Sequence, residues 1–351
     1  MNKKKIAVGM SGGVDSSVAA LMLKQQGHDV IGITLLLKPT ANKEEEDAMF
    51  KEVNDAKAVC EKIGIEHHTA DFRKEFNQTI IKNFVDEYKN GRTPNPCILC
   101  NSVIKFGKML DFAKDLGYDY LATGHYAIIE EKEGEFFLRR SENPKDQSYF
   151  LYLLTQEQLS HVLFPLEKME KSETREIAEK FELPVAKKSD SQDICFIKNG
   201  DYISFIDKRL DKPFEIGDFV DENGKVLGKH KGIYRYTVGQ RRGLGIALGE
   251  RCFVGNIDVT TNNITLLRAD SKKERKFIVG NPHFINIEKL ENEIEVMAKT
   301  RYRAKLEKAI IRPLGDDVEL EFLSYETLVS PGQSAVFYID DTVVGGGILK
   351  K

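Results

Sequence analysis

Cys97 and Cys100 stand three residues apart in the stretch T-P-N-P-C-I-L-C-N, residues 93–101. Two thiols at this spacing could hold a structural metal, cycle as a redox pair or supply a nucleophile, and the spacing alone does not decide among these roles. The chain has five cysteines, and the others are Cys60, Cys195 and Cys252. An odd number in a reducing compartment argues against a disulfide framework and leaves metal binding and catalysis open.

A second chemical feature is G-M-S-G-G-V-D-S-S, residues 9–17, between a predicted strand over residues 4–10 and a predicted helix over residues 14–26. Gly12 and Gly13 let the backbone curl so that successive N–H groups converge on an anion, and the helix N-terminus adds partial positive charge. The hydroxyl donors would be Ser11, Ser16 and Ser17. No Gly-Lys-Ser/Thr follows, so this is not a Walker A loop. The loop thus lacks a lysine that would bind the γ-phosphate. This suits an enzyme in which the α-phosphate of ATP is attacked and pyrophosphate leaves.

The segment resembles the PP-loop of the ATP pyrophosphatases, which include asparagine and argininosuccinate synthetases and tRNA-thiolating enzymes. In this group the loop serves adenylation of an oxygen. The resemblance implies ATP as co-substrate and Mg²⁺, for which Asp15 is a nearby carboxylate. The loop residues implied to bind the nucleotide are Gly9, Met10, Ser11, Gly12, Gly13, Val14, Asp15 and Ser16.

The composition is that of a soluble globular protein, and the N-terminus and the lack of long apolar stretches lead us to expect the cytoplasm. The chain has 351 residues, of which 41% are hydrophobic and 30% charged, and about 150 residues per domain predicts two or three domains. No stretch approaches the roughly 18 apolar residues of a membrane helix, and the N-terminus lacks the apolar core of a signal peptide. The net charge of −3 does not by itself indicate nucleic-acid binding. However, basic residues cluster at 229–242 and 299–305, either as solvated faces or as phosphate-binding surfaces.

The order of predicted elements divides the chain into three parts. Strands and helices alternate up to about residue 122, and one of these helices is a charged helix over about 43–63 that Gly64 closes. This alternation predicts a parallel sheet with helices on both faces. A hairpin is predicted over residues 126–140 with its turn at Glu133–Gly134, followed by helices at about 145–160 and 172–182. We therefore expect an α/β chain: an N-terminal PP-loop domain of the adenine nucleotide alpha hydrolase type over 1–198, a small, mostly-β, tRNA-binding domain over 199–275, and a C-terminal β-barrel-like domain over 276–351.

Eight segments, spread from the first strand to the last, closely resemble the tRNA-specific 2-thiouridylases of the MnmA family. They are GMSGGVDSS (9–17), GRTPNPCILCNSVIKFG (91–107), ATGHYA (122–127), KDQSYFLY (145–152), KSDSQDICFI (188–197), YTVGQRRGLGI (236–246), KTRYR (299–303) and SPGQSAVFY (330–338). The resemblance implies that ATP adenylates O2 of the wobble uridine in tRNAs with Lys, Glu or Gln type anticodons. A persulfide sulfur then replaces that oxygen, giving 2-thiouridine, AMP and pyrophosphate. The sulfur would come from a cysteine desulfurase or a sulfur relay protein.

The same resemblance assigns roles to individual residues. Cys195 would carry the persulfide, and Cys100 would release its sulfur and leave a Cys100–Cys195 disulfide. Further contacts implied are Leu35 and Gly124 to the nucleotide, Asn95, Pro96 and Cys97 to the target base, and Lys145, Asp146, Gln147, Arg301 and Tyr302 to the tRNA.

Local sequence context agrees with these roles. A place for Cys100 just before a predicted helix would favour its thiolate, whereas Asp190 and Asp193 would raise the pKa of the Cys195 thiol. The basic stretches then favour phosphate binding, and their tyrosines could stack on bases. By contrast, Cys60 and Cys252 are expected to be small buried hydrophobic residues.

Cys97 departs from the family pattern, because many relatives have Asp at this position. Cys97, Cys100 and Cys195 could therefore bind an iron–sulfur cluster with one open iron that takes inorganic sulfide as the nucleophile. Alternatively, Cys97 is a spare thiol and the persulfide route operates. A more distant possibility is a different PP-loop adenylating ligase.

Overall fold

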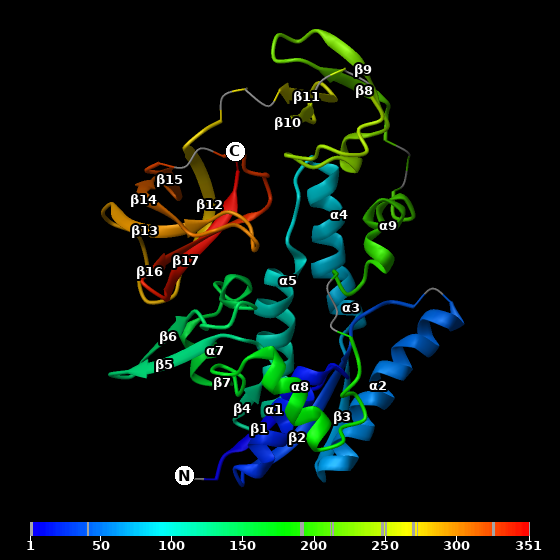
Figure 1. The fold of residues 1–351 in the computed structure, drawn as a ribbon, viewed down its shortest axis with the longest axis vertical. Coiled ribbons are helices and arrows are strands. Elements are labelled where there is room, and N and C mark those ends of the chain that lie inside the picture. Colours follow the sequence, from blue (N-terminus) through cyan, green and yellow to red (C-terminus); the bar gives the residue numbers. More distant parts are fainter. Residues whose placement is uncertain are drawn as a thin grey trace. The chain divides into compact units, whose positions relative to one another are not determined.

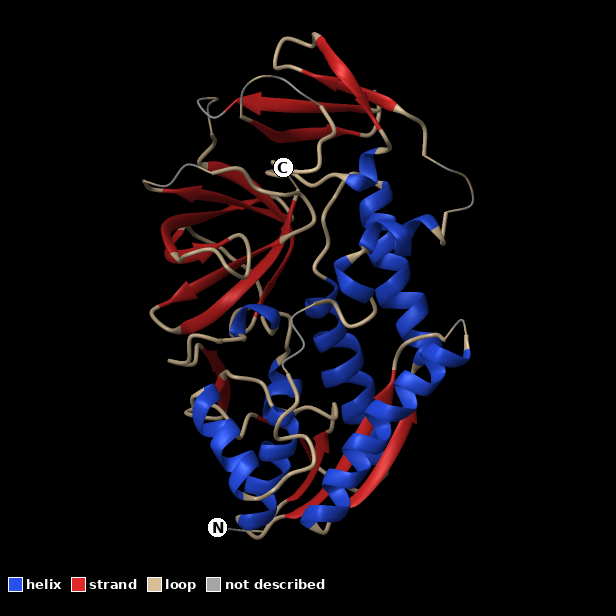
Figure 2. Ribbon diagram, turned by 45° about the vertical axis from the view of Figure 1, so that its right-hand side comes forward, coloured by secondary structure: helices blue, strands red, loops and turns tan. Residues whose placement is uncertain are grey.

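The computed structural model describes residues 3–40, 42–189, 193–210, 212, 214–246, 249, 251–268, 271, 273–324 and 327–350. The chain divides into two compact units (Figures 1 and 2). The first unit comprises residues 1–80, 97–192 and 341–344, and the second comprises 81–96, 193–340 and 345–351. Among the described residues, no helix has the length and apolar character needed to cross a membrane.

A five-stranded parallel sheet organises the first unit (Figure 1). Its strand order is β3-β2-β1-β4-β7. The bounds are β1 Lys5–Gly9, β2 Asp29–Leu36, β3 Glu66–Asp71, β4 Tyr120–Ala122 and β7 Val162–Leu163. The predicted parallel sheet is confirmed.

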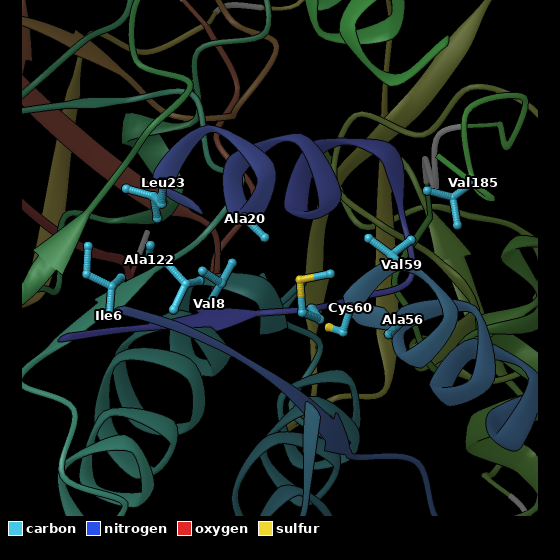
Figure 3. Packing of buried hydrophobic residues seen from close by; sticks show 11 residues of the cluster. Ile6, Val8, Ala20, Leu23, Ala56, Val59, Cys60, Ala122 and Val185 are labelled. Atoms are coloured by element: carbon cyan, nitrogen blue, oxygen red, sulfur yellow. The ribbon is translucent and has the colours of Figure 1, made fainter. Parts of the chain in front are cut away.

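The two faces of this sheet are covered by different helices. Ile6 and Val8 of β1 pack into a buried cluster with residues of helices α1 (Val14–Gln25) and α2 (Lys43–Ile63), as Figure 3 shows. Gly9 instead approaches Met109, since a Cβ on Gly9 would lie 2.9 Å from the terminal methyl of that side chain. Strand residues that alternate between helices on opposite faces explain the near-continuous apolar run of β1.

Helix ends in the first unit follow local capping chemistry. The Asn42 side chain accepts a hydrogen bond from the Glu45 N–H (2.9 Å) and caps the start of α2. Gly64 ends that helix with φ 69°, a left-handed conformation that glycine adopts at little cost. The predicted helix over 43–63 is confirmed.

The cysteine pair lies inside a helix that begins earlier than expected. Pro96 starts α5 (Pro96–Leu99), which continues as a π-helical segment (Cys100–Lys108) and then as α6 (Met109–Asp115). The expectation that Cys100 precedes the helix is wrong. Proline is favoured at the first helical position, because the N–H it lacks would have no intrahelical partner there.

The segment after β4 is less helical than predicted. The hairpin is confirmed, with β5 (Ile128–Lys132), β6 (Glu135–Arg139) and positive φ at Glu133 and Gly134. However, the helix predicted over about 145–160 is reduced to a 3₁₀ turn (Ser148–Phe150) and α7 (Gln156–Ser160), and α8 spans Lys171–Lys180. Hydrogen bonds that the Asp146 carboxylate accepts hold this segment in a loop.

The second unit begins with helical elements. In the first unit, α3 (Arg73–Phe76) leads into a π-helical turn (Asn77–Ile81). The helices of the second unit include α4 (Lys82–Lys89) and α9 (Tyr202–Asp207). A four-stranded sheet follows in the order β10-β11-β8-β9. Its strands are β8 Gly217–Val220, β9 Val226–His230, β10 Cys252–Asp258 and β11 Asn263–Arg268.

The C-terminal strands close into a six-stranded barrel, which confirms the predicted β-barrel-like fold. The order is β12-β15-β14-β13-β16-β17, closed by pairing of β12 with β17. The strands are β12 Lys276–Phe284, β13 Ile294–Lys299, β14 Glu307–Leu314, β15 Asp317–Phe322, β16 Ser334–Ile339 and β17 Thr342–Leu349. Gly345 permits the closure, because a Cβ there would lie 2.2 Å from the His283 carbonyl oxygen across the β12–β17 pair.

Candidate active site

The phosphate loop joins β1 to α1 at the carboxyl edge of the parallel sheet. The Met10 N–H donates to the Ile33 carbonyl (2.8 Å), and the Met10 carbonyl accepts from Thr34 Oγ1 (2.9 Å), so the loop's first residues stay attached to β2. Gly12 has φ 67°, and a Cβ there would lie 2.7 Å from the Glu52 carbonyl oxygen of α2. Only glycine therefore fits this turn without displacing α2.

The serines of the loop have different partners. The Ser11 and Ser16 hydroxyls are 3.2 Å apart, and the Ser11 N–H donates to Ser16 Oγ. Ser17 is fully buried and its hydroxyl donates to the Gly13 carbonyl (2.7 Å). The expectation that Ser17 offers its hydroxyl to a phosphate is therefore wrong, whereas Ser11 is exposed.

Asp15, in the first turn of α1, is held by residues from two distant segments. Its Oδ1 accepts from Lys171 Nζ (2.6 Å) and from the Tyr126 hydroxyl (2.8 Å). The same hydroxyl lies 3.1 Å from Thr174 Oγ1 of α8. Asp15 Oδ2 receives no hydrogen bond from the described residues, so this oxygen can serve a divalent cation carried by ATP. No local sequence signal indicated Lys171, and Tyr126 was noted only as part of the segment ATGHYA.

Two further nucleotide candidates lie at the same edge. Gly124 follows β4, and a Cβ on it would lie 2.7 Å from the Asp15 carbonyl carbon and 2.8 Å from the Ser16 nitrogen. Leu35 is half-buried near the carboxyl end of β2. In the sheet, β1 has β2 on one side and β4 on the other, so the strand order reverses at β1. In open α/β sheets, ligands bind at the carboxyl ends of the strands beside such a switch point.

The two cysteines of the 96–115 helix have opposite environments. Cys97, in the first turn, is exposed, whereas Cys100, one turn later, is buried at 7% exposure. Desolvation by surrounding protein raises the pKa of the Cys97 thiol, and the positive charge of Lys105 opposes that shift. Because Cys100 follows the first turn, its thiolate lacks the helix-start position that was expected to stabilise it. Beside Cys97 in the chain, Asn95 is half-buried and Pro96 is buried.

His125 lies beside this helix. Its Nδ1 is 2.7 Å from Thr123 Oγ1, and its ring packs against Phe106. Desolvation, and secondly the charge of Lys105, hold the pKa of His125 well below its usual value. His125 is therefore neutral at physiological pH and does not act as a cation toward a phosphate.

Cys195 lies in the second unit at the corner of a tight turn. The Ile197 N–H donates to the Ile194 carbonyl (2.9 Å), which places Cys195 second in a four-residue turn, where it is exposed. The next residue, Phe196, anchors the turn by ring contacts with Phe84 and Phe205, both at 5.2 Å between centroids. Asp190, expected to raise the pKa of Cys195, lies outside the described residues.

The two remaining cysteines, Cys60 and Cys252, are assigned no role in the chemistry. Cys60 is fully buried in α2, and burial raises the pKa of its thiol to about 12. Its Sγ would lie 2.5 Å from a Cβ on Gly32, so it fills the space beside that glycine. The expectation that Cys60 is a small buried hydrophobic residue is confirmed, whereas Cys252 is only partly buried.

Comparisons with known proteins cover almost the whole chain. Family models match as a tRNA methyl transferase HUP domain over residues 4–199, a tRNA methyl transferase PRC-barrel domain over 203–268 and an aminomethyltransferase beta-barrel domain over 274–349. A tRNA-specific 2-thiouridylase MnmA 2 from Thermoanaerobacter sp. (strain X514) is 48% identical over 99% of this chain and 98% of its own length. The chain belongs to the MnmA family of tRNA-specific 2-thiouridylases. Relatives named tRNA-specific 2-thiouridylase MnmA from Clostridium acetobutylicum (46% identical, 99% of each chain) and Clostridium perfringens (47%, 100% of this chain and 99% of the relative) agree.

Lys145–Gln147, the segment expected to contact tRNA, is a loop held by hydrogen bonds. The buried Asp146 carboxylate accepts from the Ser141 N–H (3.1 Å) and from both the N–H (3.2 Å) and hydroxyl (2.8 Å) of Ser148. Gln147 exchanges two hydrogen bonds with the Tyr126 backbone. Asp146 and Gln147 therefore shape the loop, and Lys145 is its exposed member.

Arg301 and Tyr302, the other residues expected to contact tRNA, lie between β13 and β14 of the barrel. Arg301 is exposed, yet its guanidinium donates to Ser330 Oγ (2.8 Å) and to the Val238 carbonyl (3.3 Å). Tyr302 is half-buried, and Lys299 lies 5.6 Å from its ring centroid. In the basic stretch 229–242, by contrast, Tyr234 and Tyr236 are at most 6% exposed. The expectation that these two tyrosines stack on bases is wrong, because they pack inside the second unit.

Metal binding by the cysteines was the other expectation. Within each unit, the described residues contain no group of three or more His, Cys, Asp or Glu side chains that could hold a metal ion. A solved structure, the U34-tRNA thiolase NcsA from Methanococcus maripaludis with its [4Fe-4S] cluster, is 22% identical over 59% of this chain and 66% of its own, with a TM-score of 0.36. Structural similarity at this level supports no conclusion about a cluster in the present chain.

Proposed function

We propose that this chain is an ATP-dependent tRNA 2-thiouridylase. It adenylates O2 of the wobble uridine and replaces that oxygen with sulfur, releasing AMP and pyrophosphate. One observation carries the proposal: a phosphate loop at the switch point of a parallel sheet shares the first unit with Cys100, the thiol assigned below to sulfur release. Two of the matching family models are described as tRNA methyl transferase domains. However, a relative that is 48% identical over 99% of this chain is named a 2-thiouridylase, and this supports sulfur transfer instead of methyl transfer.

The adenylation step is assigned to the first unit. The N–H groups at the start of α1 have no intrahelical acceptors and bind the triphosphate, while Gly124 and Leu35 face the rest of the nucleotide. Mg²⁺, held with ATP through Asp15 Oδ2, would neutralise phosphate charge. The uridine oxygen then attacks the α-phosphorus, and the bond to pyrophosphate breaks. Of the base-contact residues, Asn95 and Cys97 are accessible, and an anticodon loop base is already unpaired, which lowers the cost of extruding it.

The sulfur-transfer step is assigned to Cys195 and Cys100. Exposure at a turn corner suits Cys195 to receive a sulfur atom from a desulfurase or relay protein. The terminal persulfide sulfur attacks C2 of the adenylated uridine and AMP leaves. The Cys100 thiolate then attacks Sγ of Cys195, which breaks the sulfur–sulfur bond to the base and forms the Cys100–Cys195 disulfide. An external thiol reductant supplies the two electrons that restore both thiols.

The alternative is a cluster held by Cys97, Cys100 and Cys195, with inorganic sulfide as the nucleophile. The exposed Cys97 thiol favours it, because that thiol is accessible to a metal one helical turn from Cys100. We favour the persulfide route, because it needs only the Cys100 and Cys195 thiols and no bound iron.

The deciding experiment is anaerobic purification followed by iron and sulfide analysis and a thiolation assay. Wild type, Cys97→Ala, Cys100→Ala and the control Cys252→Ala are supplied with a cysteine desulfurase, ³⁵S-cysteine, ATP and tRNA, and 2-thiouridine and AMP are quantified. We expect iron-free protein, loss of activity in Cys100→Ala, and substantial activity in Cys97→Ala and Cys252→Ala. Iron in the wild type that disappears in Cys97→Ala, with sulfide replacing the desulfurase, would establish the cluster route instead.

A second assay tests the adenylation itself. Exchange of labelled pyrophosphate into ATP should require tRNA with a Lys, Glu or Gln type anticodon. Exchange that proceeds equally without tRNA, or with a small-molecule acceptor in its place, would assign the chain to another class of adenylating ligase.

A further inference from the structure

Side chains hold three backbone carbonyls of the phosphate loop. Thr34 binds the Met10 carbonyl, Ser17 binds that of Gly13, and Lys188 Nζ binds that of Gly12 at 2.8 Å. The Gly12 carbonyl and the Gly13 N–H belong to one planar trans peptide and point in opposite directions. A donor that fixes the carbonyl therefore also fixes the direction of the N–H.

Both the ammonium group and the backbone of Lys188 make fixed contacts. Its ammonium pairs with Asp55 of α2 at 2.9 Å. At the backbone, its N–H donates to the Val185 carbonyl (2.9 Å) and its carbonyl accepts from Arg175 (3.3 Å). The cation thus reaches the loop from a fixed stem rather than from a mobile segment.

The ammonium meets the loop at Gly12, beside α2. Gly12, at φ 67°, lies against α2 with no room for a Cβ, and Asp55 is on the same helix. Without Lys188, the Gly12 carbonyl would keep no side-chain donor among the described residues, and its peptide could rotate. Rotation would turn the Gly13 N–H away from the anion.

We infer that Lys188 is a positioning residue for the nucleotide phosphates. It orients the Gly12–Gly13 peptide toward the anion and places a positive charge behind that peptide. The inference rests on the proposed function, because it takes ATP as the ligand of the loop. The loop lacks a lysine of its own, and Lys188 supplies the cation from 176 residues away in the sequence.

The test compares full-length Lys188→Met, Lys188→Arg and Asp55→Asn with wild type in the thiolation assay. Loss of a hydrogen bond to a charged group is worth roughly a tenfold to hundredfold change in binding. We expect Lys188→Met to raise the KM for ATP and the Ki of pyrophosphate by about that factor, with a smaller change in kcat. The Ki of adenosine, which lacks phosphates, should change less than about twofold, and Lys188→Arg should recover most of the loss.

Asp55→Asn separates positioning from simple ion-pair stabilisation. It breaks the same ion pair but leaves the Lys188 bond to Gly12, so we expect the KM for ATP to stay the same or fall. The inference is overturned if Lys188→Met binds ATP as wild type does, if adenosine weakens as much as pyrophosphate, or if Asp55→Asn reproduces Lys188→Met. Wild-type protein that neither thiolates tRNA nor binds ATP would instead refute the proposed function.

Discussion

Gly124→Ala should damage ATP use far more than it damages folding. A Cβ at Gly124 would lie 2.7 and 2.8 Å from backbone atoms of Asp15 and Ser16, which cannot swing aside as a side chain can. The start of α1 must retreat by about 0.7 Å to restore an ordinary contact of 3.4 Å. Such overpacking costs about 1–3 kcal/mol of stability.

The effect on activity follows from the same displacement. Gly124 presses on the first turn of α1, whose N–H groups are proposed to bind the triphosphate, and misplacement of a reacting group by about 1 Å can cost about a hundredfold in rate. We expect kcat/KM for ATP to fall by about tenfold to a hundredfold at saturating tRNA. The measurement is an ATP titration of thiolation, with thermal unfolding recorded for the same samples.

Gly117→Ala is the matched control. Gly117 follows α6 with φ 82° and open space around it, so alanine there strains the backbone by about 1 kcal/mol without touching the loop. This variant should lose stability but keep the wild-type KM for ATP. If Gly124→Ala kept that KM as well, or if the control lost as much ATP use, the inferred contact between Gly124 and the loop would be refuted.

Three other perturbations address the rest of the molecule. Asp146→Asn weakens three hydrogen bonds to a buried carboxylate, so urea unfolding should show a loss of about 1–3 kcal/mol and tRNA binding should weaken. Desolvation lowers the pKa of buried His230, so the unfolded state binds more protons below pH 6.5; stability should fall as pH drops from 6.5, and His230→Gln should reduce that dependence in denaturant titrations. Cys60 should resist iodoacetamide at pH 8 until denaturant is added, as peptide mass spectrometry can check; rapid labelling of native protein would contradict its buried place.

Local sequence signals predicted the elements whose stability is local. The ends of α2 follow from Asn42 and Gly64, and the hairpin turn follows from Glu133–Gly134, because capping and turn chemistry depend on neighbouring residues. The helix start at Pro96 was missed although proline at the first helical position is itself a signal. With Pro96 as the first helical residue, Cys97 and not Cys100 lies at the start of the helix.

The remaining misses come from interactions that span long separations. Lys171 reaches Asp15 across 156 residues, and no periodic pattern or turn signal connects them. The helix expected over 145–160 failed because Asp146 binds backbone N–H groups on both sides of itself, which competes with helix formation. Burial of Tyr234 and Tyr236 likewise depends on packing in the second unit, and a basic stretch of sequence does not reveal it.

The charges around the loop suggest why it can release pyrophosphate. Two acids near the loop each pair with a lysine, Asp15 with Lys171 and Asp55 with Lys188, so these four side chains add no net charge. Affinity for the phosphates must then come from backbone N–H groups and the accompanying cation, whereas a net positive loop would hold the leaving pyrophosphate more tightly. On this argument Asp55→Asn, which leaves the charge of Lys188 unbalanced, should slow pyrophosphate release while it tightens ATP binding. Faster turnover in that variant at saturating ATP would show that the balance of charge has another purpose.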